Sequence, residues 1–122
     1  MFSFLKIERL CSKTAIDALF ANGKSKTQFP IKLIYKLAEF ESPFPIRAMF
    51  VVPKKKYKRA NKRNIIKRRM REAYRLNKQT LYESVGNTKY DIMFVYLSNE
   101  ESDYALIESK MVLLINQMGG KN

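Results

Sequence analysis

Apolar residues recur every three to four positions near the start of the chain. This spacing predicts a helix over residues 12–23, because such residues fall on one face of a helix. Ser12 can cap the helix, and Asn22 with Gly23 can end it. The apolar stripe consists of Ala15, Ile16, Leu19 and Phe20.

The same spacing returns near the end of the chain and predicts a last helix that ends at Gly119 and Gly120. Ser98 and Glu101 match a capping box ahead of this helix, and Ser102 is a competing cap. The apolar face consists of Ile107, Met111, Leu114, Ile115 and Met118.

Three segments between these helices favour strands: residues 29–38, 46–52 and 90–97. In the first, a two-residue alternation separates an apolar face from Lys32 and Lys36. That apolar face consists of Ile31, Leu33, Tyr35 and Leu37. The second segment is apolar on both faces, which is typical of a central strand.

A helix in the second half of residues 54–78 and a loop over residues 82–89 complete the pattern. The predicted order is therefore α-β-β-α-β-α. We expect one α+β domain over residues 1–122, with the helices packed on a small mixed sheet.

Positive charge is concentrated in one stretch. Residues 54–78 contain thirteen Lys and Arg but a single acid, Glu72, a net charge of +12. The rest of the chain has eleven basic and ten acidic residues. A small protein with one concentrated basic segment most often meets nucleic acid, and a membrane surface is the main rival.

A helical wheel divides this basic stretch into two faces. The predicted buried stripe consists of Ile66, Met70, Ala73, Tyr74 and Asn77. The opposite face carries Asn64, Arg68, Arg71 and Arg75, flanked by Lys67 and Lys78 on one side and by Ile65 and Glu72 on the other. Guanidinium groups match phosphate oxygens, so this face predicts contact with a polyphosphate backbone. Glu72 is expected to pair with Arg68 or Arg75.

Several absences narrow the function further. The chain has no His and no close cluster of acids, which speaks against a nuclease that acts alone. It also lacks zinc-finger spacing and a leucine heptad, so RNA is favoured over DNA. Cys11 is the only cysteine, and no apolar run reaches membrane-spanning length. We expect a cytoplasmic protein without a membrane partner.

The stretch ANKRNIIKRRMREAYR resembles the signature of the bacterial ribonuclease P protein subunit. Matching positions are Arg63, Asn64, Lys67, Arg68, Arg71, Glu72, Ala73 and Tyr74, preceded by the paired Lys55 and Lys56. Three places depart from the family pattern. Ile65 replaces a usual Arg, Ile16 stands where Phe is frequent, and Tyr57 with Lys58 replaces a segment that often contains Gly.

This resemblance implies a fold like the second domain of ribosomal protein S5. It also implies that a separate RNA subunit, ribonuclease P RNA, hydrolyses precursor tRNA with Mg²⁺, and that the protein itself binds no cofactor. The expected RNA-binding residues are Arg63, Asn64, Lys67, Arg68, Arg71, Arg75, Lys55 and Lys56. A cleft between the first helix and the sheet would hold the 5′ leader, with Phe20, Tyr35, Val52 and Ile16 as its residues. The alternative is a structural RNA-binding protein of ribosomal type.

Overall fold

The computed structural model describes residues 8–55 and 59–119. Three helices and four strands follow one another along the chain. In order they are α1 (Lys13–Asn22), β1 (Lys24–Gln28), β2 (Ile31–Leu37), β3 (Ile46–Val51), α2 (Ala60–Val85), β4 (Tyr90–Tyr96) and α3 (Tyr104–Met118). The expected α+β class is confirmed, with one strand more than predicted.

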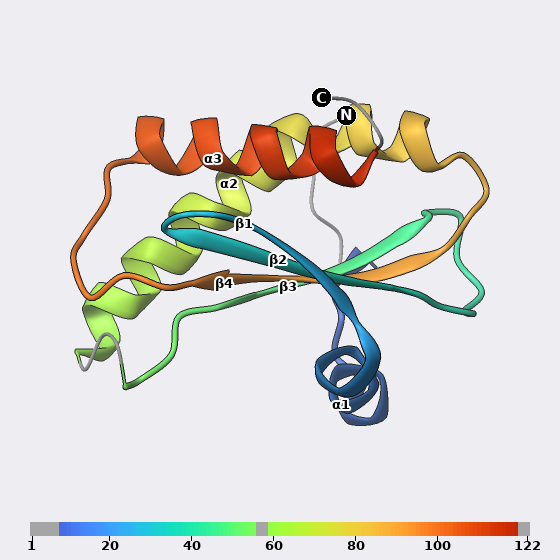
Figure 1. The fold of residues 1–122 in the computed structure, drawn as a ribbon, viewed down its shortest axis with the longest axis horizontal. Helices are drawn as coiled ribbons and strands as arrows, with labels where there is room; N and C mark the ends of the chain where they lie inside the picture. Colours follow the sequence, from blue (N-terminus) through green and yellow to red (C-terminus); the bar gives the residue numbers. More distant parts are fainter. Residues whose placement is uncertain (1–7, 56–58, 120–122) are drawn as a thin grey trace.

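The strands form one mixed sheet in the order β1-β2-β4-β3. β1 pairs with β2 and β2 with β4 in antiparallel fashion, whereas β3 and β4 are parallel. A parallel pair needs a crossover connection, and α2 provides it between β3 and β4. α2 and α3 cover one face of the sheet, called here the inner face, and α1 lies on the outer face (Figure 1).

Strand alternation gives each face its own hydrophobic core. Ile31 and Leu33 of β2 belong to the large core under α2 and α3, whereas Ile34 points the other way. On the outer face Ile34 packs with Leu19 of α1 and Met93 of β4. The positions of a strand alternate between faces, so one strand serves both cores.

The basic helix has the buried stripe that its periodicity predicts, with one change. Its buried residues are Ile66, Met70, Ala73, Tyr74, Lys78 and Leu81. Asn77, predicted within the stripe, is half-buried and donates hydrogen bonds to the carbonyl oxygen of Ala73 and to Glu108. Lys78, predicted beside the outward face, is buried instead, because a carboxylate from the N-terminal segment meets it there.

Three features of the secondary structure differ from the sequence predictions: an additional strand, the end of α2 and the N-cap of α3. The short strand β1 was not predicted, because its sequence KSKTQ has no apolar residue, and its pairing with β2 makes it a strand. α2 continues to Val85, through half of the segment predicted as a loop. The cap of α3 is Asp103, whose carboxylate accepts from the backbone N–H of Leu106 at 2.8 Å, so the predicted caps Ser98 and Ser102 were wrong.

Candidate nucleic-acid interface

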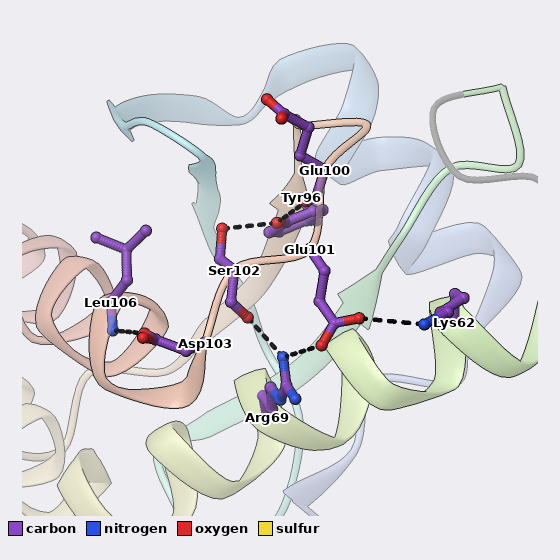
Figure 2. Close-up of polar contacts among 8 residues, drawn as sticks. All are labelled: Lys62, Arg69, Tyr96, Glu100, Glu101, Ser102, Asp103 and Leu106. Carbon is purple, nitrogen blue, oxygen red and sulfur yellow. Dashed lines mark hydrogen bonds and ion pairs between the residues drawn. The ribbon is translucent and has the colours of Figure 1, made fainter.

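The cations of α2 divide into those bound within the protein and those facing outward. Lys62 and Arg69 belong to the first group, and both converge on Glu101 in the segment ahead of α3 (Figure 2). The ion-pair distances are 3.5 Å from Lys62 Nζ and 3.0 Å from Arg69 Nη1. Arg69 also donates to the carbonyl oxygen of Ser102 at 2.7 Å. These two cations therefore hold the start of α3 against α2.

The N-cap loop of α3 is fixed from the sheet as well. The hydroxyl of Tyr96, at the end of β4, donates to the carbonyl oxygen of Glu100 and lies 2.8 Å from the Ser102 hydroxyl (Figure 2).

The sequence did not predict that Lys62 and Arg69 pair with Glu101. The acidic sequence SNEES facing a basic helix was the available signal.

Arg75 and Lys78 are also paired with carboxylates. Arg75 binds Glu72 through two hydrogen bonds, of 3.0 Å from Nε and 2.5 Å from Nη2, which confirms the expected pairing of Glu72. The hydrogen bond from Arg75 lowers the pKa of the Glu72 carboxyl below its ordinary value. Lys78 Nζ lies 2.5 Å from Glu8 Oε1, and the Tyr82 hydroxyl donates to the same oxygen.

Lys67, Arg68 and Arg71 form the second group. Across residues 8–55 and 59–119, no carboxylate lies within ion-pair distance of any of the three. Arg68 and Arg71 are exposed and Lys67 is half-buried, and exposed Asn64 precedes Arg68 by one turn. We call these four residues the open basic face. Its excess positive charge is not compensated by acids of the described chain.

The other residues expected to bind RNA lie around this face. Arg63 and Arg75 are half-buried, and both interact with other groups of the protein. Lys55 is exposed in the turn after β3, between the sheet and α2. Lys56 lies outside the described residues. Four of the eight predicted residues therefore belong to the open basic face.

The structure distributes the four residues predicted for the leader cleft over both faces of the sheet. Ile16 and Phe20 lie on α1 at the outer face, where Ile16 packs on the outer core. Tyr35 and Val52 pack with the inner core, under the other two helices. Tyr35 alternates with Ile34 on β2, so its ring packs with the inner core while Ile34 packs with the outer core.

Phe20 and Tyr35 line two separate hollows. Phe20, 61% exposed, lines one of about 260 Å³ at the outer face, together with Gly23, Ser25, Lys32, Ile34, Val95 and Leu97. Tyr35 lines another of about 250 Å³, together with Asn22, Lys24, Lys36, Leu37 and Tyr90. We call the first the outer hollow. Its floor and its lysine come from β2 and β4, and sequence reasoning had assigned Lys32 only to a polar face.

Close contact at Gly23 brings α1 onto the outer face. A Cβ atom there would overlap the carbonyl oxygen of Leu19 and the side chain of Ile34. A residue with no side chain therefore lets the end of α1 close against β2. The last turn of α1, which carries Phe20, lies beside the outer hollow as a result.

Neither a metal centre nor a membrane span was found within the described residues. No three His, Cys, Asp or Glu side chains of residues 8–55 and 59–119 lie together in a way that could hold a metal ion. No helix in the same part of the chain is long and apolar enough to cross a membrane.

Comparisons with known proteins identify the family and the fold of the chain. A model of the family described as Ribonuclease P matches residues 4–119. The Ribonuclease P protein component of Porphyromonas gingivalis is 32% identical over 121 residues, covering 98% of this chain and 88% of that protein. Its counterpart in Chlorobium phaeobacteroides is 41% identical over 98 residues, covering 78% of this chain and 67% of that protein.

Solved structures share the fold at lower sequence identity. The RNase P protein of Staphylococcus aureus superposes with a TM-score of 0.73 at 17% identity, covering 94% of this chain and 98% of that one. The RNase P protein of Thermotoga maritima gives 0.71 at 24% identity, covering 90% and 96%. These two structures support the fold, and the family match and the curated relatives support the assignment. The chain belongs to the ribonuclease P protein component family.

Proposed function

We propose that this protein is the RNA-binding subunit of ribonuclease P. In this proposal the open basic face of α2 binds the RNA subunit, and the outer hollow beside α1 binds the unpaired 5′ leader of precursor tRNA. The RNA subunit, with its Mg²⁺ ions, hydrolyses the phosphodiester bond. The protein contributes binding and orientation, and it supplies no catalytic group.

The open basic face carries the first part of the proposal. Lys67, Arg68 and Arg71 have no ion-pair partner among the described residues, while four neighbouring cations of the same helix are paired. An array of cations without partners repels itself, and phosphates at matching positions remove that repulsion. The buried side of α2 fixes the helix on the sheet, so the array is held in place before RNA arrives.

Exposure of Phe20 supports the second part. A ring that is largely exposed beside an apolar floor can stack on an unpaired base. Lys32 lines the same hollow and can neutralise a backbone phosphate of the bound strand. The combination of aromatic ring, apolar floor and cation suits single-stranded RNA without selecting a sequence.

Reconstitution at low magnesium tests the proposal. The protein is mixed with a bacterial ribonuclease P RNA and a precursor tRNA, and cleavage is compared with that of the RNA alone and of the protein alone. We expect cleavage to increase only when both subunits are present. RNA binding without any increase in cleavage would indicate the structural RNA-binding alternative, and cleavage by the protein alone would indicate a nuclease.

Two triple variants that each remove three positive charges test whether the stimulation of cleavage depends on α2. The triple variant Lys67→Ala, Arg68→Ala, Arg71→Ala removes three cations from the open basic face. The control, Lys13→Ala, Lys26→Ala, Lys110→Ala, removes three cations from α1, β1 and α3. We expect the first variant to lose the stimulation and the control to retain most of it. An equal loss in both would mean that net charge alone is responsible.

A further inference from the structure

A small hollow at the edge of β3 connects the N-terminal segment to the basic helix. Its volume is about 160 Å³, which is below the roughly 300 Å³ at which sites for drug-sized ligands begin. Two arginines from distant parts of the sequence line it, Arg9 and Arg71. The remaining lining residues are Leu10, Cys11, Ala48, Met49 and Phe50. We call it the edge hollow.

The chain on both sides of Arg9 is fixed by buried contacts. Glu8 is fully buried and binds Lys78 and Tyr82 of α2. Leu10 is buried in the outer core, and its N–H donates to the carbonyl oxygen of Ala48 at 2.8 Å. Arg9 lies between these two anchored residues and is exposed. Its backbone position is therefore set by its neighbours, so binding has to order only the side chain of Arg9.

Arg71 reaches the edge hollow from α2. It precedes Lys78 by seven residues, two helical turns, so both lie on the side of α2 that faces the N-terminal segment. Lys78 forms an ion pair with Glu8, whereas Arg71 is exposed and has no carboxylate partner among the described residues. Glu8 is buried and paired with Lys78, so its charge does not compensate Arg71.

We propose that the edge hollow binds one phosphate group of an RNA strand between the guanidinium groups of Arg9 and Arg71. Guanidinium groups offer planar pairs of N–H donors that fit phosphate oxygens. The site extends the RNA-binding surface from α2 around the edge of β3 toward α1. This inference rests on the proposed function and adds to it a residue, Arg9, outside the basic helix.

Cys11 makes the site directly testable. It is exposed, it lines the edge hollow, and it is the only cysteine of the chain, so N-ethylmaleimide labels one defined position. The labelling rate is measured with the protein alone, with ribonuclease P RNA, and with that RNA plus precursor tRNA. A control carries Cys11→Ser and Ser109→Cys, which moves the thiol to the exposed side of α3.

We expect bound RNA to slow labelling of Cys11 at least about tenfold and to leave labelling at position 109 nearly unchanged. Protection by ribonuclease P RNA alone assigns the phosphate to that subunit. Protection that appears only with precursor tRNA assigns it to the substrate. Undiminished labelling of Cys11 in a complex that binds RNA normally overturns the edge site and leaves the proposed function standing. Failure of the protein to bind RNA at all overturns both.

A double-mutant cycle distinguishes one shared phosphate from a generally basic surface. Arg9→Ala and Arg71→Ala should each weaken RNA binding, by about threefold to tenfold for a charge-assisted contact. If both arginines hold the same phosphate, their effects are not independent. The loss of RNA affinity in the double variant should then be much smaller than the product of the two single losses. Multiplicative effects would show that the two arginines act independently and would overturn the shared site.

Charged thiol reagents give an independent measurement on the unmutated chain. A methanethiosulfonate that carries a sulfonate places a negative group in the edge hollow, next to both arginines. A methanethiosulfonate of similar size that carries a trimethylammonium group places a positive charge there. The sulfonate should lower RNA affinity more than the trimethylammonium group, because it occupies the place of the phosphate. The opposite order, or equal effects, would contradict the site.

Discussion

Lys78 of α2 and Glu8 ahead of α1 form an ion pair inside the protein, 70 positions apart in the sequence, with a distance of 2.5 Å between Nζ and Oε1. Tyr82 donates a hydrogen bond to the same carboxylate. The pair binds the N-terminal segment to the helix that carries the open basic face. One member of the most basic stretch of the chain therefore stabilises the fold and is not available to RNA.

Removing the cation of this pair should destabilise the protein strongly. Lys78→Met leaves the Glu8 carboxylate buried without its partner, and breaking a buried pair in this way costs about 3–5 kcal/mol. Urea unfolding followed by circular dichroism measures the change. The control is Lys13→Met, because Lys13 forms an exposed pair with Asp17 and its loss should hardly move the midpoint.

The double variant Glu8→Gln with Lys78→Met checks the cause. It removes both charges, so it should recover a large part of the stability that Lys78→Met loses. If the double variant is as unstable as the single one, packing around the lysine stem, and not the unpaired carboxylate, accounts for the loss.

The ion pairs of Glu101 should make part of the stability depend on pH. The hydrogen bond from Arg69, then the charges of Arg69 and Lys62, lower the pKa of the Glu101 carboxyl from its ordinary value of 4.5. A carboxyl whose pKa is lower in the folded state stabilises that state above the unfolded pKa. This contribution is lost as the pH falls below 4.5 and through the folded pKa.

Glu101→Gln should therefore be less stable than the parent protein at pH 7 and should lose less stability on acidification. Urea midpoints at pH 7, 4.5 and 3 measure both effects. Glu100→Gln is the matched control, because Glu100 is an exposed neighbour with no ion pair among the described residues. Parallel pH curves for the parent and Glu101→Gln would contradict the role of this carboxylate.

Periodicity predicted the elements that bury an apolar stripe, and it identified Arg68 and Arg71 as outward residues. It could not show that Lys78 is buried, because Lys78 lies at the border of the stripe and its partner is distant in sequence. The alternation of apolar and polar residues also predicted that β2 has two different faces. Which face carries α1 is a tertiary property, so the sequence did not show that Tyr35 packs with the inner core. The short polar strand β1 exists only through its pairing with β2.

Single substitutions on the open basic face should change how RNA binding depends on salt. Arg68→Ala and Arg71→Ala each remove a predicted phosphate contact, so each should lower the slope of log K against log salt by about one unit or less. Filter binding to ribonuclease P RNA at several salt concentrations measures the slope. Lys110→Ala on α3 removes a cation elsewhere and should leave it unchanged. An unchanged slope in the arginine variants would remove those residues from the interface.

Phe20→Ala should weaken binding of precursor tRNA with a long 5′ leader more than binding of a leaderless substrate. Stacking of a base on an aromatic ring contributes about 1–3 kcal/mol, and Phe20 is 61% exposed beside the outer hollow. Tyr35→Ala tests the other hollow, and Leu113→Ala removes an exposed apolar side chain from α3 on the opposite side of the sheet. We expect a leader-dependent loss for Phe20→Ala and none for Leu113→Ala. If Tyr35→Ala alone shows the leader-dependent loss, the leader follows the hollow at Tyr35 and Tyr90, and the outer hollow is not its binding site.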